Sequence, residues 1–161
     1  MNLPGAAVYD VLEGLVIDIM KTLEGIPEDD LNHWKPAAEQ QGGGEMNTFA
    51  AIAVHTASAG RWMFTHQVLG KDVERDREAE FHATSSLAEI EAGFQNWLAD
   101  VRMYLDELDT IDLAQPATTV RANHPTWTRA HFLLHMLEHT GIHLGHLQIH
   151  RQLWDAERNK G

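Results

Sequence analysis

Apolar residues recur at helical spacing in four segments of this 161-residue chain, and that repetition constrains the fold more than any other feature. In each segment the apolar positions follow i, i+3, i+4 intervals, which places one apolar stripe along a helix. Such stripes have to be buried against other helices. The sequence therefore predicts an all-α fold, a four-helix bundle forming a single domain over residues 1–161, with helices near residues 4–25, 47–70, 86–108 and 126–157.

Local capping signals set the expected helix ends. Asn47 is the predicted N-cap of the second helix, which should end near Gly70. Ser86 and Glu89 have the spacing of a capping box, and this box should open the third helix. The apolar stripe of that helix continues to Leu108. The connections are long enough that loop length alone leaves the helix directions open.

The connections themselves differ in composition. The segment after the first helix contains prolines and three consecutive glycines, so we expect a loop with one helical turn at Pro27–Leu31. Residues 71–85 are charged and aperiodic. That pattern predicts a solvated connection between the second and third helices.

The composition excludes several classes of function. The chain has 24 acidic and 12 basic residues, a net charge of −12, which argues against binding nucleic acid or an anionic membrane surface. No apolar run approaches the ~18 residues that a membrane span needs, and the N-terminus lacks the basic region of a secretory signal. Cysteine is absent, so any thiol chemistry has to use a thiol from a substrate. These features favour a cytoplasmic protein.

Histidines are concentrated in the last predicted helix. The chain has 11 histidines, and six of them lie between positions 131 and 150. At 100° per residue all six fall within about one third of the helix circumference. Leu133, Leu137 and Leu144 fall on the opposite side. The six are His131, His135, His139, His143, His146 and His150.

This histidine face predicts a metal site but does not locate it. Two imidazoles at i, i+4 lie one turn apart on one face and can chelate an ion. The pairs 131/135, 135/139, 139/143 and 146/150 all have that spacing. A third ligand has to come from another helix. His55 is the candidate because it shares the apolar, inward-facing stripe of the second helix, where an imidazole needs a partner; His66 shares that face but lies near the helix end.

Other motifs give weaker readings. Residues His135 to His139 match the H-x-x-E-H string of inverted zinc proteases. That motif needs a further acidic ligand downstream on another helix, whereas the residues after His139 continue the same predicted helix. The paired Glu-x-x-His motifs of di-iron carboxylate bundles do not occur in the sequence. Trp62 lies on one helical face with His55 and is expected in the core or in the wall of a pocket.

Two motifs resemble the DinB/YfiT-like superfamily of metal-binding four-helix bundles. The C-terminal stretch LLHMLEHTGIHLGHLQIHRQLW is similar to the family's last-helix pattern, which maps onto His139, His143, Gly145, His146 and Arg151. The segment AVHTASAGRWMFTHQVLG resembles the second-helix signature, which maps onto His55, Trp62 and Gly70. GIPEDDLNHWKPA is similar to the loop between the family's first two helices.

The resemblance implies a choice that spacing leaves open. It implies that His55, His139 and His143 hold one divalent metal ion. Ligand softness suits three histidines to Zn, Ni, Fe or Cu, of which Zn, Ni and Fe are the expected elements. It also implies an up-down-down-up topology with a long crossover between helices two and three, and often a homodimer. Histidines 131, 135 and 150 are not family ligands, so they are expected to line a pocket or to form a second, weaker site.

The resemblance further implies thiol chemistry. Relatives include transferases and isomerases that use mycothiol or bacillithiol, so the leading hypothesis is a metal-dependent thiol S-transferase that detoxifies electrophiles. The alternatives are a hydrolase with a metal-bound hydroxide and a non-catalytic metal-binding stress protein. Glu138 or His146 is expected to orient a ligand imidazole. Arg61 or Arg151 is expected to pair with a substrate carboxylate.

Overall fold

The computed structural model describes residues 5–37, 46–119 and 125–160. Its long helices are α1 (Gly5–Leu23), α3 (Phe49–Trp62), α5 (Leu87–Met103) and α7 (Arg129–Arg158). Shorter helices are α2 (Glu28–His33), α4 (Arg77–Glu80) and α6 (Leu105–Thr110), and the π-helical segment η2 (Met63–Val68) continues α3. No described residue belongs to a β-strand, so the predicted all-α fold is confirmed.

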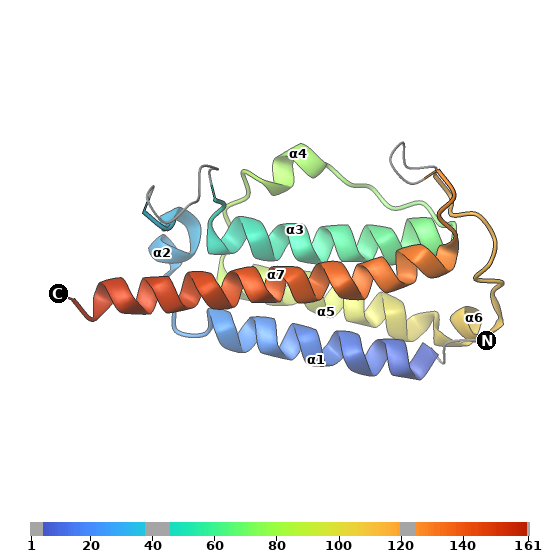
Figure 1. Cartoon of the computed structure of the whole chain (residues 1–161), viewed down its shortest axis with the longest axis horizontal. Helices are drawn as coiled ribbons and strands as arrows, with labels where there is room; N and C mark the ends of the chain where they lie inside the picture. The colour runs from blue at the N-terminus through green and yellow to red at the C-terminus, as the bar shows by residue number, and fades with distance from the viewer. Residues whose placement is uncertain (1–4, 38–45, 120–124, 161) are drawn as a thin grey trace.

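The four long helices lie side by side (Figure 1). In that view α1 and α7 run in one direction and α3 and α5 run in the other. Helix α7 packs against α1 and α3, and α5 packs against the same two helices from the other side. The segment that contains α4 crosses back along the bundle from the end of η2 to the start of α5 (Figure 1). Within the described residues, no helix combines the length and the apolar composition needed to cross a membrane.

Large apolar side chains fill the space between the helices. The apolar stripe read from the first segment is buried at Leu12, Val16 and Ile19. Aromatic rings occupy the centre of the core, and Trp97 lies directly against Gly60 of α3, where a methyl group would overlap the indole ring. The fully buried aromatic residues are Phe49, Phe64, Phe94, Trp97 and Phe132.

The capping predictions are confirmed at one helix and wrong at another. Ser86 accepts a hydrogen bond from the backbone N–H of Glu89, whose side chain in turn accepts from the N–H of Ser86. The second long helix is capped by Thr48 and not by Asn47, because the Thr48 hydroxyl accepts from the backbone N–H of Ala51. Both residue types are good caps, so the sequence alone does not distinguish the two neighbouring positions.

Two helices are less regular than their apolar stripes predict. Helix α3 passes into the π-helical segment η2 before the chain turns at Gly70, which has a φ of 73°. The predicted third helix is interrupted at Tyr104, where φ is −107° and ψ is 18°, and α6 follows. The stripe nonetheless continues through the break, since Leu108 is buried. Periodicity therefore identified the buried positions but not the local backbone geometry.

The prediction of a solvated connection at residues 71–85 is wrong for part of the segment. This connection contains α4, which Asp76 caps by accepting from the backbone N–H of Ala79. Glu80 at the end of α4 is only 4% exposed, and the side chain of Arg75 is 15% exposed. Charged sequence therefore does not mean a solvated surface here, because the two charges are buried as a pair.

Candidate metal centre

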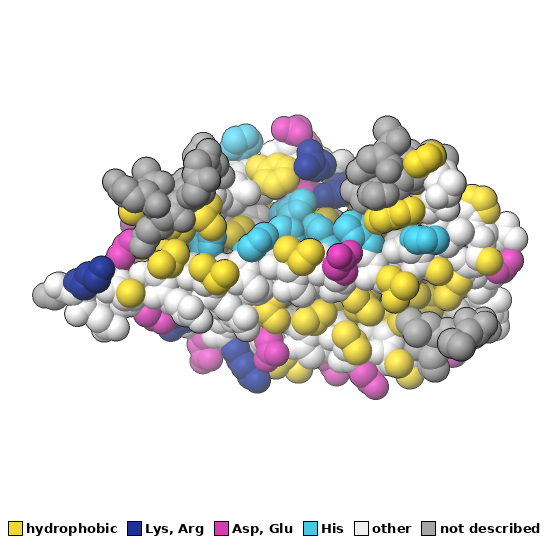
Figure 2. Space-filling view, in the orientation of Figure 1, with side chains coloured by type: hydrophobic (Ala, Val, Ile, Leu, Met, Phe, Trp, Pro, Cys, Tyr) yellow, Lys and Arg dark blue, Asp and Glu magenta, His cyan; other side chains and the backbone are white. Residues whose placement is uncertain are grey.

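Helices α3 and α7 bring three histidines together. His55 lies on α3, and His139 and His143 lie one turn apart on α7. The Nε2 atom of His139 is 3.2 Å from Nε2 of His55 and 3.1 Å from Nε2 of His143. Among the residues that the structure describes, these three offer ligand atoms that all lie within 4.8 Å of one another. Figure 2 shows histidine side chains gathered near the centre of the face of the molecule that it presents.

Burial keeps these imidazoles neutral. Removal from water, followed by the charges of neighbouring histidines, lowers the pKa of His139 to about 3. The same two causes lower the pKa of His143 to about 4. Burial also lowers the pKa of His55, although its hydrogen bond to Glu80 acts in the opposite direction. Neutral imidazole is the form that binds a metal ion, so all three can act as ligands at neutral pH.

The facing ring nitrogens of the cluster have too few N–H groups to hydrogen-bond to one another, and this favours a bound cation. Glu80 accepts a hydrogen bond from Nδ1 of His55 at 2.8 Å, so Nε2 of His55 presents a lone pair. The Nε2 of His139 faces two other nitrogens and has at most one hydrogen to share between them. Neutral imidazoles alone therefore leave the cluster short of hydrogens. A metal ion would accept a lone pair from each ring, so the three residues fit one divalent ion.

The ring of His55 is fixed from two sides. Phe81 stacks on it with the ring centroids 4.9 Å apart and the planes inclined by 27°. Glu80 binds its Nδ1 atom. The buried Nδ1 of His139, by contrast, has no hydrogen-bond partner among the described residues. His55 is therefore the member of the cluster whose orientation the protein determines most completely.

A carboxylate that the sequence did not reveal stands behind His55. Glu80 accepts hydrogen bonds from Arg75 at 2.7 and 2.8 Å and from the Ser58 hydroxyl at 2.6 Å. Although burial alone would raise the pKa of Glu80, the hydrogen bonds from Arg75, Ser58 and His55 lower it below its usual value. The one sequence signal for such a residue is that an inward-facing histidine needs a partner, and this signal does not say where the partner lies.

The residues expected to orient the ligands lie in different places. The Nδ1 atom of His146 is 3.4 Å from Nδ1 of His143, at the edge of the cluster. Glu138 contacts His135 at 3.1 Å, and its side chain is 65% exposed. Trp62 stacks on His66 and lies under the guanidinium group of Arg75, 5.3 Å from its ring centroid. His146 therefore adjoins the cluster, Glu138 contacts a neighbouring histidine, and Trp62 contacts His66 and Arg75.

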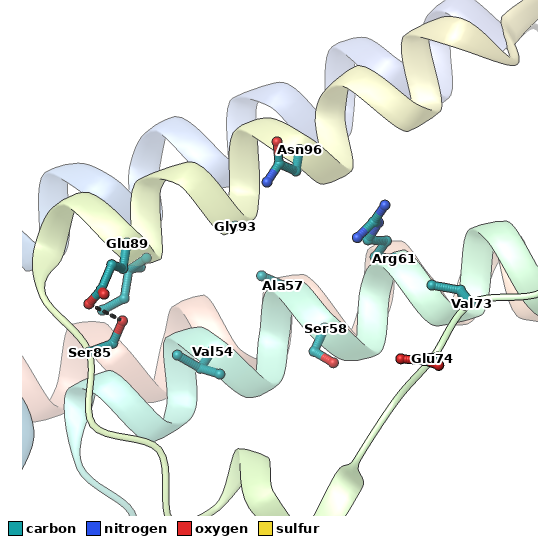
Figure 3. Close-up of a pocket in the computed structure, with 11 residues that line it drawn as sticks. Val54, Ala57, Ser58, Arg61, Val73, Glu74, Ser85, Glu89, Gly93 and Asn96 are labelled. Atoms are coloured by element: carbon teal, nitrogen blue, oxygen red, sulfur yellow. Dashed lines mark hydrogen bonds between the residues drawn. The ribbon is translucent and has the colours of Figure 1, made fainter.

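The structure places both predicted arginines away from the three histidines. Arg151 donates to the carbonyl oxygens of Thr22 and Glu24, where α1 ends, and to the carboxylate of Asp155. Arg61 donates to Asp100 at 2.6 Å. Arg61 also lines a separate cavity of about 330 Å³ between α3, α5 and the crossover (Figure 3). Helix α3 thus has the candidate metal centre on one face and this cavity on another.

The three further histidines have distinct surroundings. His131 accepts a hydrogen bond from the backbone N–H of Thr128 and stacks on Trp127. His135 meets the edge of the same indole, with the ring centroids 5.1 Å apart. His150 is 1% exposed, and its two ring nitrogens face the carbonyl oxygens of His146 and Asn47. His150 therefore joins α7 to the start of α3, and the other two form an aromatic cluster with Trp127.

The fold and the cluster define a class of protein: all-helical, with three histidines from two helices that can hold one metal ion. A family model described as Mycothiol-S-transferase matches residues 7–156. The chain belongs to the mycothiol-S-transferase family, and the predicted resemblance to the DinB/YfiT-like group is confirmed. No curated protein matches the chain.

Proposed function

We propose that this protein is a metal-dependent thiol S-transferase that uses a low-molecular-weight thiol, with mycothiol as the first candidate. In the reaction the sulfur of the thiol forms a bond to an electrophilic carbon, the leaving group departs with its electron pair, and the thiol proton goes to solvent. The convergence of three neutral histidine nitrogens is the observation that supports this proposal most directly. The family match is the reason for proposing a thiol, and mycothiol first, as a substrate.

The proposed ligands are His55, His139 and His143, and Zn, Ni and Fe are the proposed ions. A divalent ion in this position would lower the pKa of a thiol that binds to it. Since the described part of the chain brings three histidines and no carboxylate into this group, the ion would retain an open position for a substrate. That arrangement is typical of catalytic and not of structural sites.

The protein's own residues prepare this site. Glu80 and Phe81 hold the ring of His55 so that its Nε2 atom faces His139. A cavity of about 300 Å³ adjoins the cluster on the side of His143 and provides space for part of a substrate. Its lining is formed by Met46, Asn47, Ile52, His143, His146 and His150.

The test is a conjugation assay with purified protein, mycothiol and an electrophilic aryl halide. We expect thioether formation that is lost when a chelator removes the metal and that returns when Zn²⁺ is added back. Turnover that persists in the fully metal-free protein would contradict the mechanism. Hydrolysis of an ester panel without any thiol would support a hydrolase instead. The variant His143→Ala should behave like the chelated protein.

A further inference from the structure

Glu80 is a buried charge in a segment that otherwise reads as a surface linker. Its side chain is 4% exposed. An ionised carboxylate is costly to bury unless it is paired and hydrogen-bonded. Here both oxygens are satisfied: Oε1 accepts from Ser58 and Arg75, and Oε2 accepts from Arg75 and His55. A carboxylate held by three side chains has little freedom to move.

These contacts fix how the carboxylate of Glu80 faces His55. Arg75 binds both oxygens with a fork of two N–H groups, which fixes the plane of the carboxylate. Ser58 donates from α3 itself, one turn after His55, so it fixes the distance between the carboxylate and that helix. The remaining acceptor position on Oε2 faces Nδ1 of His55 at 2.8 Å. Through Glu80, the crossover therefore contacts one ring nitrogen of the cluster, Nδ1 of His55.

The protonation of Nδ1 determines whether Nε2 of His55 has a lone pair for a metal ion. A carboxylate can only accept, so Nδ1 of His55 has to hold the hydrogen. The lone pair of the neutral ring is then on Nε2, the atom that lies 3.2 Å from Nε2 of His139. Metal-binding histidines commonly donate their second N–H to a carboxylate, which fixes the tautomer and the ring orientation.

We propose that Glu80, held by Arg75 and Ser58, is a positioning residue for metal binding at His55, which makes the crossover between α3 and α5 part of the metal centre. The inference rests on the metal ligation in the proposed function. A purely structural role for Glu80 would be to neutralise the buried Arg75. The two roles differ in what they predict for metal affinity and for the His55 ring.

The test compares Glu80→Gln with Glu78→Gln, an exposed acid of the same helix whose side chain is 85% exposed. Zn²⁺ affinity is measured by competition with a chromophoric chelator, and the visible absorption spectrum of the Co²⁺-loaded protein reports ligand geometry. We expect Glu80→Gln to weaken Zn²⁺ binding by about 10–100-fold and to change the Co²⁺ spectrum. Glu78→Gln should match the unmodified protein in both measurements.

A second variant separates positioning from folding. Glu80→Gln leaves Arg75 without its carboxylate and can therefore destabilise the chain. The double variant Glu80→Gln/Arg75→Met removes both charges, and its thermal midpoint in the metal-free form should recover towards that of the unmodified protein. If Zn²⁺ affinity stays low while stability recovers, positioning is supported. If affinity recovers together with stability, the role is structural and the proposal is overturned.

Nuclear magnetic resonance of the histidine rings gives a direct readout. In the Zn²⁺-loaded protein, the Nδ1–H signal of His55 should be present and should disappear or shift in Glu80→Gln but not in Glu78→Gln. Unmodified protein that binds no metal would refute the proposed function along with this inference. Unmodified protein that binds Zn²⁺ and conjugates thiols, with Glu80→Gln equal to it in affinity and ring signals, would refute this inference alone.

Discussion

The Nε2 atoms of His55 and His139 lie 3.2 Å apart, although 84 positions separate the two residues in the chain. Neither helix can form this contact alone, because each contributes one side of it. The cluster exists only when α3 and α7 pack against each other. Metal binding and folding should therefore be coupled in this protein.

The first prediction concerns metal content. His55→Ala and His143→Ala each remove one imidazole ligand. Loss of a residue that only hydrogen-bonds to a ligand weakens metal binding by about 10–100-fold, so these two variants should weaken Zn²⁺ binding by more than that. Elemental analysis of purified protein and chelator competition measure this. His131→Ala is the matched control, because it removes an exposed histidine of the same helix. Metal content unchanged in both cluster variants would refute the site.

The second prediction concerns pH and the metal-free protein. Burial, reinforced by neighbouring histidines, lowers the pKa of His139 to about 3 and that of His143 to about 4, while an unfolded histidine titrates near about 6.5. Between these values the unfolded chain binds protons that the folded chain does not. The free energy of unfolding should therefore fall as the pH decreases from about 6.5 towards 4.

Urea unfolding of the metal-free protein at several pH values between about 7.5 and 5 measures this dependence. The double variant His139→Asn/His143→Asn should show a shallower decline over the same range. Some slope should remain, since burial also lowers the pKa of His55 and His150. A decline equal in both proteins would show that other groups cause it.

The third prediction concerns the close approach of α3 and α5. Gly60→Ala would place a methyl carbon 2.1 Å from a carbon of the Trp97 indole ring, so it should destabilise the protein by about 1–3 kcal/mol. Gly141→Ala on α7 is the control, because a methyl there meets nothing within 4 Å among the described residues. That change should stabilise by up to about 1 kcal/mol through helix propensity. Equal effects in thermal unfolding would contradict the packing described.

The fourth prediction separates a structural arginine from the site. Arg151 donates to the carbonyl oxygens of Thr22 and Glu24 beside the end of α1, so Arg151→Ala should cost about 1–2 kcal/mol of unfolding free energy. Its Zn²⁺ affinity should be unchanged. Gln152→Ala, at the exposed neighbouring position, should alter neither quantity. A variant that folds normally but loses affinity for a carboxylate-bearing substrate would instead support the role expected from the sequence.

Features that depend on local sequence were predicted well. The four apolar stripes identified the long helices, and Ser86 with Glu89 identified where α5 begins. Thr48, next to the predicted cap Asn47, shows the limit of that approach, since Asn and Thr have similar capping ability and the sequence does not distinguish adjacent candidates. The interruption at Tyr104 likewise leaves no sign in the spacing, because the apolar stripe continues through it to Leu108.

The candidate site was predicted in part. Spacing on one helix indicated several equivalent histidine pairs, and only the family pattern selected His139 and His143; the structure brings that pair together with His55. Glu80 was missed because its charged neighbours in sequence are typical of a surface, while two of its partners, His55 and Ser58, lie on another helix. Pairings between distant segments leave no periodic signal in one chain.

The separation between His55 and His139 has a further consequence for a chain that contains no cysteine. Under the proposed ligation, a bound ion would close a loop of 84 positions, much as a disulfide closes one, and would reduce the conformational entropy of the unfolded chain if it stayed bound there. If it binds the folded chain alone, the gain in stability grows with the logarithm of the free metal concentration. Unlike a disulfide, this cross-link would be set by metal supply and not by redox conditions.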